Sequence, residues 1–284
     1  MILNAMFPTR HIGNDPGAIK AWASAAEELD FHTIEVADHV FGAEPRDGWQ
    51  PIYDATQPFH ETFVTLGFLA AVTQTIQLSS GILILPQRQT GLVAKQAAEV
   101  DVLSGGRLRL GIGVGWNPVE YAALGQNWHQ RGARQAEQVE LLRQLWTGES
   151  VSFAGRFESV DRVNLMPPPV QRPIPIWFGG SSEPVIRRAA RLGDGWMPIL
   201  SPDEAPAKLT LMQQCLAESG RDRAQFGIEA WMRMDQDDPD LWAAGVEQWR
   251  ALGADYLMLY PMFQVDGVDG QIELLRRFKA AVQT

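Results

Sequence analysis

The chain has 284 residues, with 34 acidic against 24 basic side chains and a formal net charge of -10. An acidic excess disfavours nucleic-acid binding, because neutralising backbone phosphates requires a basic face. No apolar run is long enough to cross a bilayer, the N-terminus lacks signal-peptide features, and the one cysteine, Cys215, excludes an internal disulfide. We therefore expect a cytoplasmic protein that acts on a small molecule, with no nucleic-acid or membrane partner.

Strand patterns alternate with helix patterns along the whole chain, as in parallel β/α proteins. The predicted strands are residues 3–7, 33–37, 76–85, 107–114, 174–178, 195–199, 227–232 and 256–260. Eight is the number that closes a (β/α)8 barrel, and barrels of this length form one domain. The sequence therefore predicts an α/β fold of the (β/α)8 TIM-barrel class, as a single domain over residues 1–284.

Two segments interrupt this alternation. Residues 151–163 alternate like a hairpin around Ala154-Gly155, and a proline-rich stretch up to residue 173 follows them. We predict an inserted hairpin over residues 151–173, between the fourth helix and the fifth strand. Residues 41–59 are long for a strand-to-helix loop, and we interpret them as a lid or substrate loop, although a plain surface insertion stays open.

The segment after the fifth predicted strand is typical of an anion-binding turn. Gly179, Gly180, Ser181 and Ser182 lie between that strand and a predicted helix. Backbone N–H groups at the start of a helix, together with the helix dipole, favour a negatively charged ligand. An ordinary strand-to-helix connection has a similar composition, so both interpretations stay open on these residues alone.

Three chemistries that barrels often host are disfavoured. All four lysines fall in predicted helices, so none is placed to form a Schiff base inside the barrel. The five histidines are scattered with no His-x-His pair, and we expect no metal. Gly111, Gly113 and Gly115 lack the spacing of the dinucleotide-binding fingerprint.

Polar and flexible residues at the remaining strand ends mark the candidate site. Asp38 and His39 follow the second strand, and Gly81 interrupts the apolar third strand. Glycine in a buried strand indicates close approach of another group to the backbone, which could be a flat ligand ring or a neighbouring core side chain. Both explanations of Gly81 stay open.

Six segments occur in the same order in one known family. They are residues 36–39, 80–86, 103–107, 111–117, 178–181 and 193–196. On these segments the chain resembles the bacterial luciferase-like superfamily and, more narrowly, its deazaflavin (coenzyme F420)-dependent oxidoreductase branch. The resemblance extends over nearly the whole chain.

This resemblance implies a (β/α)8 barrel with one insertion, usually a homodimer, that binds a flavin or 5-deazaflavin ring in the barrel mouth. It also implies a cis peptide between Gly81 and Ile82 behind that ring. By position, the residues that would contact the cofactor are Ser80, Gly81, Ile82, Gly113, Val114, Gly115, Gly179, Gly180, Ser181 and Ser182.

The resemblance also implies the reacting side of the site. His39 would lie near the reactive ring carbon with Asp38 beside it, and Trp116 would wall the site. Trp116 stands where some deazaflavin dehydrogenases carry a proton-transferring glutamate. Residues 131–134 lack the Arg-Tyr pair of many FMN monooxygenases of the superfamily.

Three functional hypotheses follow. The leading one is hydride transfer between coenzyme F420 and a small organic substrate, with His39 as proton donor or acceptor, because an ordinary imidazole titrates near neutrality. The second is an FMN-dependent monooxygenase that uses reduced flavin and oxygen. The third is a flavin-binding barrel without catalysis.

Overall fold

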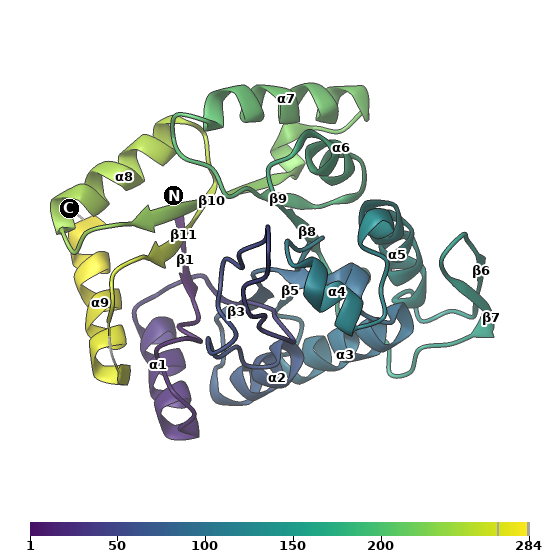
Figure 1. Ribbon diagram of the computed structural model, residues 1–284, viewed down its shortest axis with the longest axis horizontal. Coiled ribbons are helices and arrows are strands. Elements are labelled where there is room, and N and C mark those ends of the chain that lie inside the picture. The colour runs from purple at the N-terminus through teal and green to yellow at the C-terminus, as the bar shows by residue number, and fades with distance from the viewer. Residues whose placement is uncertain (266, 283–284) are drawn as a thin grey trace.

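The eight predicted strands all form, and they pair in parallel to close a barrel with helices packed around it (Figure 1). The structure is a computed structural model that describes residues 1–265 and 267–282. The barrel strands are β1 (Ile2–Met6), β2 (Thr33–Val36), β3 (Gln77–Ser80), β4 (Leu83–Ile84), β5 (Leu108–Gly113), β8 (Ile176–Gly179), β9 (Gly195–Met197), β10 (Gly227–Met234) and β11 (Tyr256–Pro261). Pairing of β3 with β5 closes the ring, so the predicted (β/α)8 fold is confirmed.

The third strand departs from the continuous run predicted for residues 76–85. It is divided into β3 and β4, and the peptide bond between Gly81 and Ile82 at the break is cis, as the resemblance implied. β3 pairs with both β2 and β5, whereas β4 pairs with β5 alone. The break therefore turns the chain at the carboxyl end of the barrel, where sites form in this fold.

The helices cover the strands from outside. They are α1 (Pro16–Glu28), α2 (Thr62–Val72), α3 (Thr90–Leu103), α4 (Pro118–Ala123), α5 (Arg131–Leu145), α6 (Glu183–Leu192), α7 (Ala205–Glu218), α8 (Pro239–Ala251) and α9 (Gly267–Val282), with short 3-10 turns at Leu85–Gln87, Trp128–Gln130 and Arg223–Gln225. The carboxylate of Asp15 caps α1 by accepting from the N–H of Gly17 over 3.0 Å, and Pro16 begins the helix. Among the described residues, no helix is long and apolar enough to span a bilayer.

The predicted hairpin is present as an antiparallel pair, β6 (Val151–Ala154) and β7 (Ser159–Val163). It projects to the side of the barrel beyond α5 (Figure 1). This pair lies far from the carboxyl ends of β1, β10 and β11, so it leaves the barrel mouth open to other loops.

A buried ionic group fills the inside of the barrel. Arg109 on β5 donates to Glu35 on β2 over 2.5 Å and to Glu229 on β10 over 2.7 Å, and its guanidinium lies 4.3 Å from the ring centre of Trp177. Burial, followed by the neighbouring charge of Glu229, raises the pKa of Glu35 against the opposing effect of Arg109. The guanidinium of Arg109 thus joins three barrel strands, because both carboxyl groups accept hydrogen bonds from it.

Candidate active site at the barrel mouth

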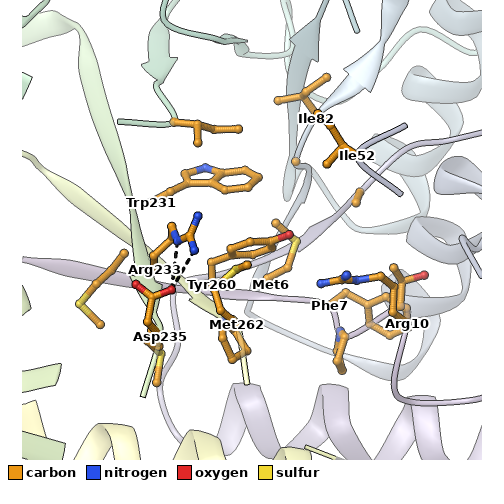
Figure 2. Close-up of a pocket in the computed structure, with 18 of the residues that line it drawn as sticks. Met6, Phe7, Arg10, Ile52, Ile82, Trp231, Arg233, Asp235, Tyr260 and Met262 are labelled. Atoms are coloured by element: carbon orange, nitrogen blue, oxygen red, sulfur yellow. Dashed lines mark hydrogen bonds and ion pairs between the residues drawn. The ribbon is translucent and has the colours of Figure 1, made fainter. Parts of the chain in front are cut away.

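A cavity of about 1070 Å³ opens at the carboxyl ends of the barrel strands. Its wall combines the ends of β1, β2, β10 and β11 with the broken third strand and the start of the connection after β5. Figure 2 shows the part of this wall that Met6, Ile82, Trp231 and Tyr260 form. Aromatic and aliphatic side chains form most of this wall. Small-molecule sites typically enclose about 300–1,000 Å³, so this space is large enough for a flavin-like ring together with a small substrate.

His39 lines this cavity and has one defined tautomer. Its Nδ1 lies 3.1 Å from Oε2 of Glu120, and the indole Nε1 of Trp116 donates to its Nε2 over 3.2 Å. Because an indole N–H can only donate, Nε2 of the neutral imidazole is the acceptor and Nδ1 carries the proton that Glu120 accepts. The structure therefore brings together two predicted site residues, His39 and Trp116, and adds Glu120 behind them.

Glu120 is a fully buried carboxylate with four donors. Besides His39, its Oε2 accepts from Nε2 of Gln87 over 3.1 Å, and its Oε1 accepts from the N–H groups of Val40 at 2.6 Å and Phe41 at 3.1 Å. Burial opposes ionisation. The hydrogen bond from His39, the attraction of that imidazole when it is protonated, and the bonds from Gln87 and Phe41 outweigh burial and lower the pKa of Glu120. Glu120 thus holds the imidazole ring and the start of the following loop.

The sequence reasoning missed Glu120 because its local signal has another explanation. Asn117 caps the short helix α4 by accepting from the N–H groups of Val119 and Glu120, and a glutamate three residues after such a cap is a common feature of helix starts. That pattern predicts a glutamate that bonds back to its own cap. Here the carboxylate instead turns toward β2, which only the fold reveals.

Asp38, predicted beside His39, is almost fully buried and bonded within the protein. Its carboxylate accepts from Oγ1 of Thr62 over 3.0 Å and from the N–H of Ile84 over 2.9 Å, and it pairs with Nη2 of Arg88 at 2.7 Å. These contacts tie the end of β2 to β4 and α2. A direct role for Asp38 beside the cofactor ring stays a prediction.

The loop of residues 41–59 packs aromatic rings over His39. The ring centres of Tyr53 and Phe59 lie 5.8 Å and 4.9 Å from that of His39, and Trp49 stacks on Trp116 at 6.2 Å. The hydroxyl of Tyr53 also lies 3.0 Å from that of Tyr260 at the end of β11. The loop after β2 is thus joined to the end of β11, which is two strands away around the barrel. Its opening as a lid stays a prediction.

The glycines at the strand ends make room for protein atoms. A Cβ at Gly113 would collide with the side chain of Ile82, and one at Gly179 would lie 2.6 Å from the same side chain. A Cβ at Gly81 would lie 2.6 Å from Oε2 of Glu35, and Gly115 has φ of 68° with Ile84 beside it. Of the two explanations for Gly81, close approach of a core neighbour is therefore the one with atoms in contact.

Other predicted cofactor residues are also bonded to the protein. The hydroxyl of Ser80 donates to the carbonyl of Gly111 over 2.7 Å, and the carbonyl of Val114 accepts from the hydroxyl of Tyr121 over 2.7 Å. Ile82 and Gly115 line the cavity. These two therefore present their surface to a ligand, whereas Ser80 supports the strand from behind.

The predicted anion turn retains unbonded donors. Gly180 has φ of 112°, which favours glycine, and its N–H donates to the carbonyl of Met197 over 3.2 Å. The Ser181 hydroxyl donates to the carbonyl of Ile199 over 2.8 Å. Within the described chain the N–H groups of Ser181 and Ser182 donate to no protein acceptor, and they precede α6. An anion is suited to that position, although phosphate there stays a prediction.

Two arginines, one at the start of α5 and one within α6, add positive charge without a carboxylate partner among the described residues. Arg131 lies 3.5 Å over the ring centre of Trp128, and Arg188 donates to Gln135 over 3.3 Å. Neither guanidinium has a carboxylate within 4.0 Å among the residues described. Burial and then the charges of Arg131 and Arg191 lower the pKa of Arg188. Like charges left uncompensated favour a bound anion.

A family model described as luciferase-like monooxygenase matches residues 1–279. The chain belongs to this family. An uncharacterized protein of Mycobacterium tuberculosis is 35% identical over 208 residues, which cover 70% of this chain and 71% of that protein. The F420-dependent hydroxymycolic acid dehydrogenase of the same organism is 30% identical over 234 residues, covering 81% of this chain and 62% of that enzyme.

Solved structures agree on the fold. The monooxygenase RslO1 from Streptomyces bottropensis superposes with a TM-score of 0.83 at 20% identity, covering 100% of this chain and 99% of that one. An F420-dependent secondary alcohol dehydrogenase, in complex with an F420-acetone adduct, gives 0.81 at 17% identity over 100% and 99% of the two chains. The predicted family is confirmed, and the chain is an enzyme of the oxidoreductase class.

Proposed function

We propose that this chain is a deazaflavin (coenzyme F420)-dependent oxidoreductase that transfers a hydride between the cofactor and a small organic substrate. The observation that carries the proposal is His39, which faces the cavity with its tautomer fixed by Glu120 at 3.1 Å. Relatives named as F420-dependent dehydrogenases support this choice of cofactor. When bound, the deazaflavin supplies the ring carbon that accepts or releases the hydride.

The residues present fit such a cofactor. Ile82 and Gly115 offer an apolar wall for a flat ring at the cavity edge. The free N–H groups of Ser181 and Ser182 suit a phosphate at the start of α6, and Arg131 with Arg188 add positive charge for an anionic tail. The ten cofactor residues named from the sequence remain part of this proposal.

His39 would hold or release the proton that accompanies hydride transfer. Its Nε2 carries the lone pair and is at present hydrogen-bonded by Trp116, so a substrate hydroxyl reaches that nitrogen by replacing the indole N–H. Protonation at Nε2 would give an imidazolium whose charge is balanced by the Glu120 carboxylate. Trp116 would then act as both a wall of the site and a placeholder for the substrate hydroxyl.

The second candidate keeps this site and changes the cofactor to FMN, with oxygen as co-substrate. It is favoured by the description of the family as luciferase-like monooxygenases. The pair of tyrosine hydroxyls at Tyr53 and Tyr260 would equally close the site over that ring. The non-catalytic alternative receives no support, because relatives at 30% identity or more are named as dehydrogenases.

Titration of the purified protein with coenzyme F420 and, separately, with FMN tests the proposal. We expect tight binding of the deazaflavin and loss of about 10-fold or more in affinity in Ser181→Asp, because the new carboxylate repels an anion at the turn. Thr210→Asp, on the exposed side of α7, is the matched control. Tighter binding of FMN would move the assignment to the second candidate.

We further propose that the enzyme acts as a homodimer in the cytoplasm, as the family resemblance implies. Sedimentation equilibrium of the purified protein measures its oligomeric state. A single species at the monomer mass of 31.5 kDa would contradict it.

A further inference from the structure

Arg10 lies in the connection after β1 and reaches into the cavity at some distance from the predicted ring site. Its guanidinium points toward Tyr260 and Met6 from the opposite side of the cavity to Trp231 (Figure 2). The carbon of the guanidinium lies 5.2 Å from the ring centre of Tyr53. Tyr53 also contacts His39, with ring centres 5.8 Å apart, so Arg10 and the imidazole lie next to the same aromatic ring.

Arg10 is half-buried and has no polar partner. Among the described residues its guanidinium makes no hydrogen bond and no ion pair, although it carries five N–H donors. The other charged residues of this wall are satisfied: Asp38 pairs with Arg88, and Arg233 pairs with Asp235 at 2.8 Å. Among these described charged residues, Arg10 is therefore the cation whose N–H groups have no protein acceptor.

The surroundings of Arg10 define what that acceptor is attached to. Met6, Ile52, Trp231 and Met262 give the wall around it an apolar and aromatic character. The Nε1 of Trp231 is buried and donates to no acceptor in the described chain. A ligand that fits has a flat, mostly apolar body and oxygen acceptors at one end.

The charge of the site favours a carboxylate over a phosphate. A single guanidinium forms two parallel hydrogen bonds to a carboxylate and neutralises its one charge. A phosphate monoester carries about two charges at neutral pH, and the second would remain uncompensated in an apolar cavity, which is unfavourable.

We propose that Arg10 binds the carboxylate of a flat, largely apolar substrate, so that the enzyme acts on small aromatic or unsaturated organic acids. This inference rests on the proposed function, because it assigns the far end of the same cavity to the substrate. In this arrangement the reacting carbon of the substrate lies beside His39. Its carboxylate lies at Arg10, on the part of the wall next to Tyr53. Arg10 is then a specificity-determining residue that takes no part in the proton transfer.

Binding of matched acids and amides tests this assignment. The probes are benzoate, cinnamate and 2-naphthoate, each paired with its neutral primary amide, and phenyl phosphate. Dissociation constants are measured by ligand-observed NMR on the protein with and without saturating coenzyme F420. We expect at least one acid to bind about 10- to 100-fold more tightly than its amide, as expected for charge-assisted hydrogen bonds.

Arg10→Met should abolish this preference, whereas Arg233→Met, which removes a cation already paired with Asp235, should leave it within about threefold. The affinity for coenzyme F420 should be the same in Arg10→Met and the wild type. Equal binding of acids and amides, no binding of any acid, or a preference that survives in Arg10→Met would overturn the inference. Tighter binding of phenyl phosphate than benzoate would overturn the choice of carboxylate.

The test separates this inference from the proposed function. Failure to bind either F420 or FMN would contradict the proposed function, yet the preference for acids would still be measured on the protein without cofactor. Tight binding of F420 with no preference for acids would contradict the role of Arg10 alone.

Discussion

Glu120 and His39 are 81 positions apart in the chain, and their side chains meet over 3.1 Å at the barrel mouth. Glu120 lies on the short helix after β5, and His39 follows β2 on another part of the barrel. The same carboxylate accepts from the N–H groups of Val40 and Phe41, so it fixes the backbone that carries the imidazole as well as the ring. Glu120 is therefore a positioning residue for His39.

Replacing His39 with Ala should reduce turnover about 100- to 10,000-fold, the usual contribution of a positioned acid or base. Cofactor affinity should change little, because the proposed phosphate contacts lie at the turn before α6. Steady-state kinetics and a cofactor titration measure the two effects. His129→Ala, an exposed histidine, is the control. Unchanged turnover in the His39 variant would remove its catalytic role.

Replacing Glu120 with Gln should lower turnover about 10- to 100-fold, because a hydrogen bond to a charged group is lost next to His39. The amide oxygen still serves Val40 and Phe41, but the amide nitrogen opposes the N–H of His39 and the amide of Gln87. Kinetics of this variant against Glu140→Gln, an exposed glutamate on α5, provide the measurement. Equal turnover of both would argue that His39 needs no carboxylate.

The free energy of unfolding should depend on pH because folding lowers the pKa of Glu120. A carboxyl whose pKa is lowered by folding contributes stability above its ordinary pKa, and that contribution is lost as pH falls through the folded value. The wild type should thus exceed Glu120→Gln in free energy of unfolding at pH 7, with a gap that narrows in acid. Urea unfolding over a pH series measures it, and a gap independent of pH would contradict the prediction.

The contribution of Glu35 to the free energy of unfolding should have the opposite dependence on pH. Its pKa is raised in the folded protein, so its contribution is full below the ordinary carboxyl pKa and is lost as pH rises toward the folded value. Glu35→Gln keeps a neutral group beside Arg109 and should flatten this fall in stability above about pH 4.3. The same unfolding series tests it, with Glu140→Gln, an exposed glutamate on α5, as control. An unchanged slope in Glu35→Gln would show that Glu35 is ionised.

Gly113→Ala should destabilise the protein by about 1–3 kcal/mol, because its Cβ collides with Ile82 in a packed wall. Gly67→Ala is the matched control: it lies within α2, nothing is within 4 Å of the added Cβ, and we expect about 0.5–1 kcal/mol of stabilisation. Thermal unfolding of both variants measures the two changes in stability. Equal effects would mean that Ile82 shifts to make room.

Much of the fold could be predicted because strands and helices carry local signals. The apolar stripe of Ile19, Trp22 and Ala26 is buried in α1, and Asp15 and Pro16 begin that helix as their types suggest. The break in the third strand could not be located from periodicity, because Ser79 and Ser80 before it are as buried as Leu83 and Ile84 after it. Gly81 was recognisable as a glycine in a buried strand, but only the family resemblance indicated a cis peptide between Gly81 and Ile82.

The candidate site could be predicted only in part, because some of its residues meet through contacts between distant parts of the chain. His39 and Trp116 stand at strand ends, which sequence reasoning can identify, and they do meet. Glu120 contacts His39 over 81 positions, and Tyr260 contacts Tyr53 over 207 positions. No local pattern encodes such pairings. Asp38 carries a site-like signal in the sequence, yet its three donors come from the protein.

Turnover under strictly anaerobic conditions separates an F420-dependent hydride transfer from an oxygen-dependent reaction of FMN. The wild type and His39→Ala would be mixed with oxidised coenzyme F420 and small alcohols, which donate a hydride, and separately with the reduced coenzyme and small aldehydes or unsaturated acids, which accept one. The redox state of the coenzyme would be followed by its fluorescence. We expect the wild type to convert the coenzyme with at least one substrate in the absence of oxygen and His39→Ala to be strongly impaired. Turnover only with reduced FMN and oxygen would contradict it.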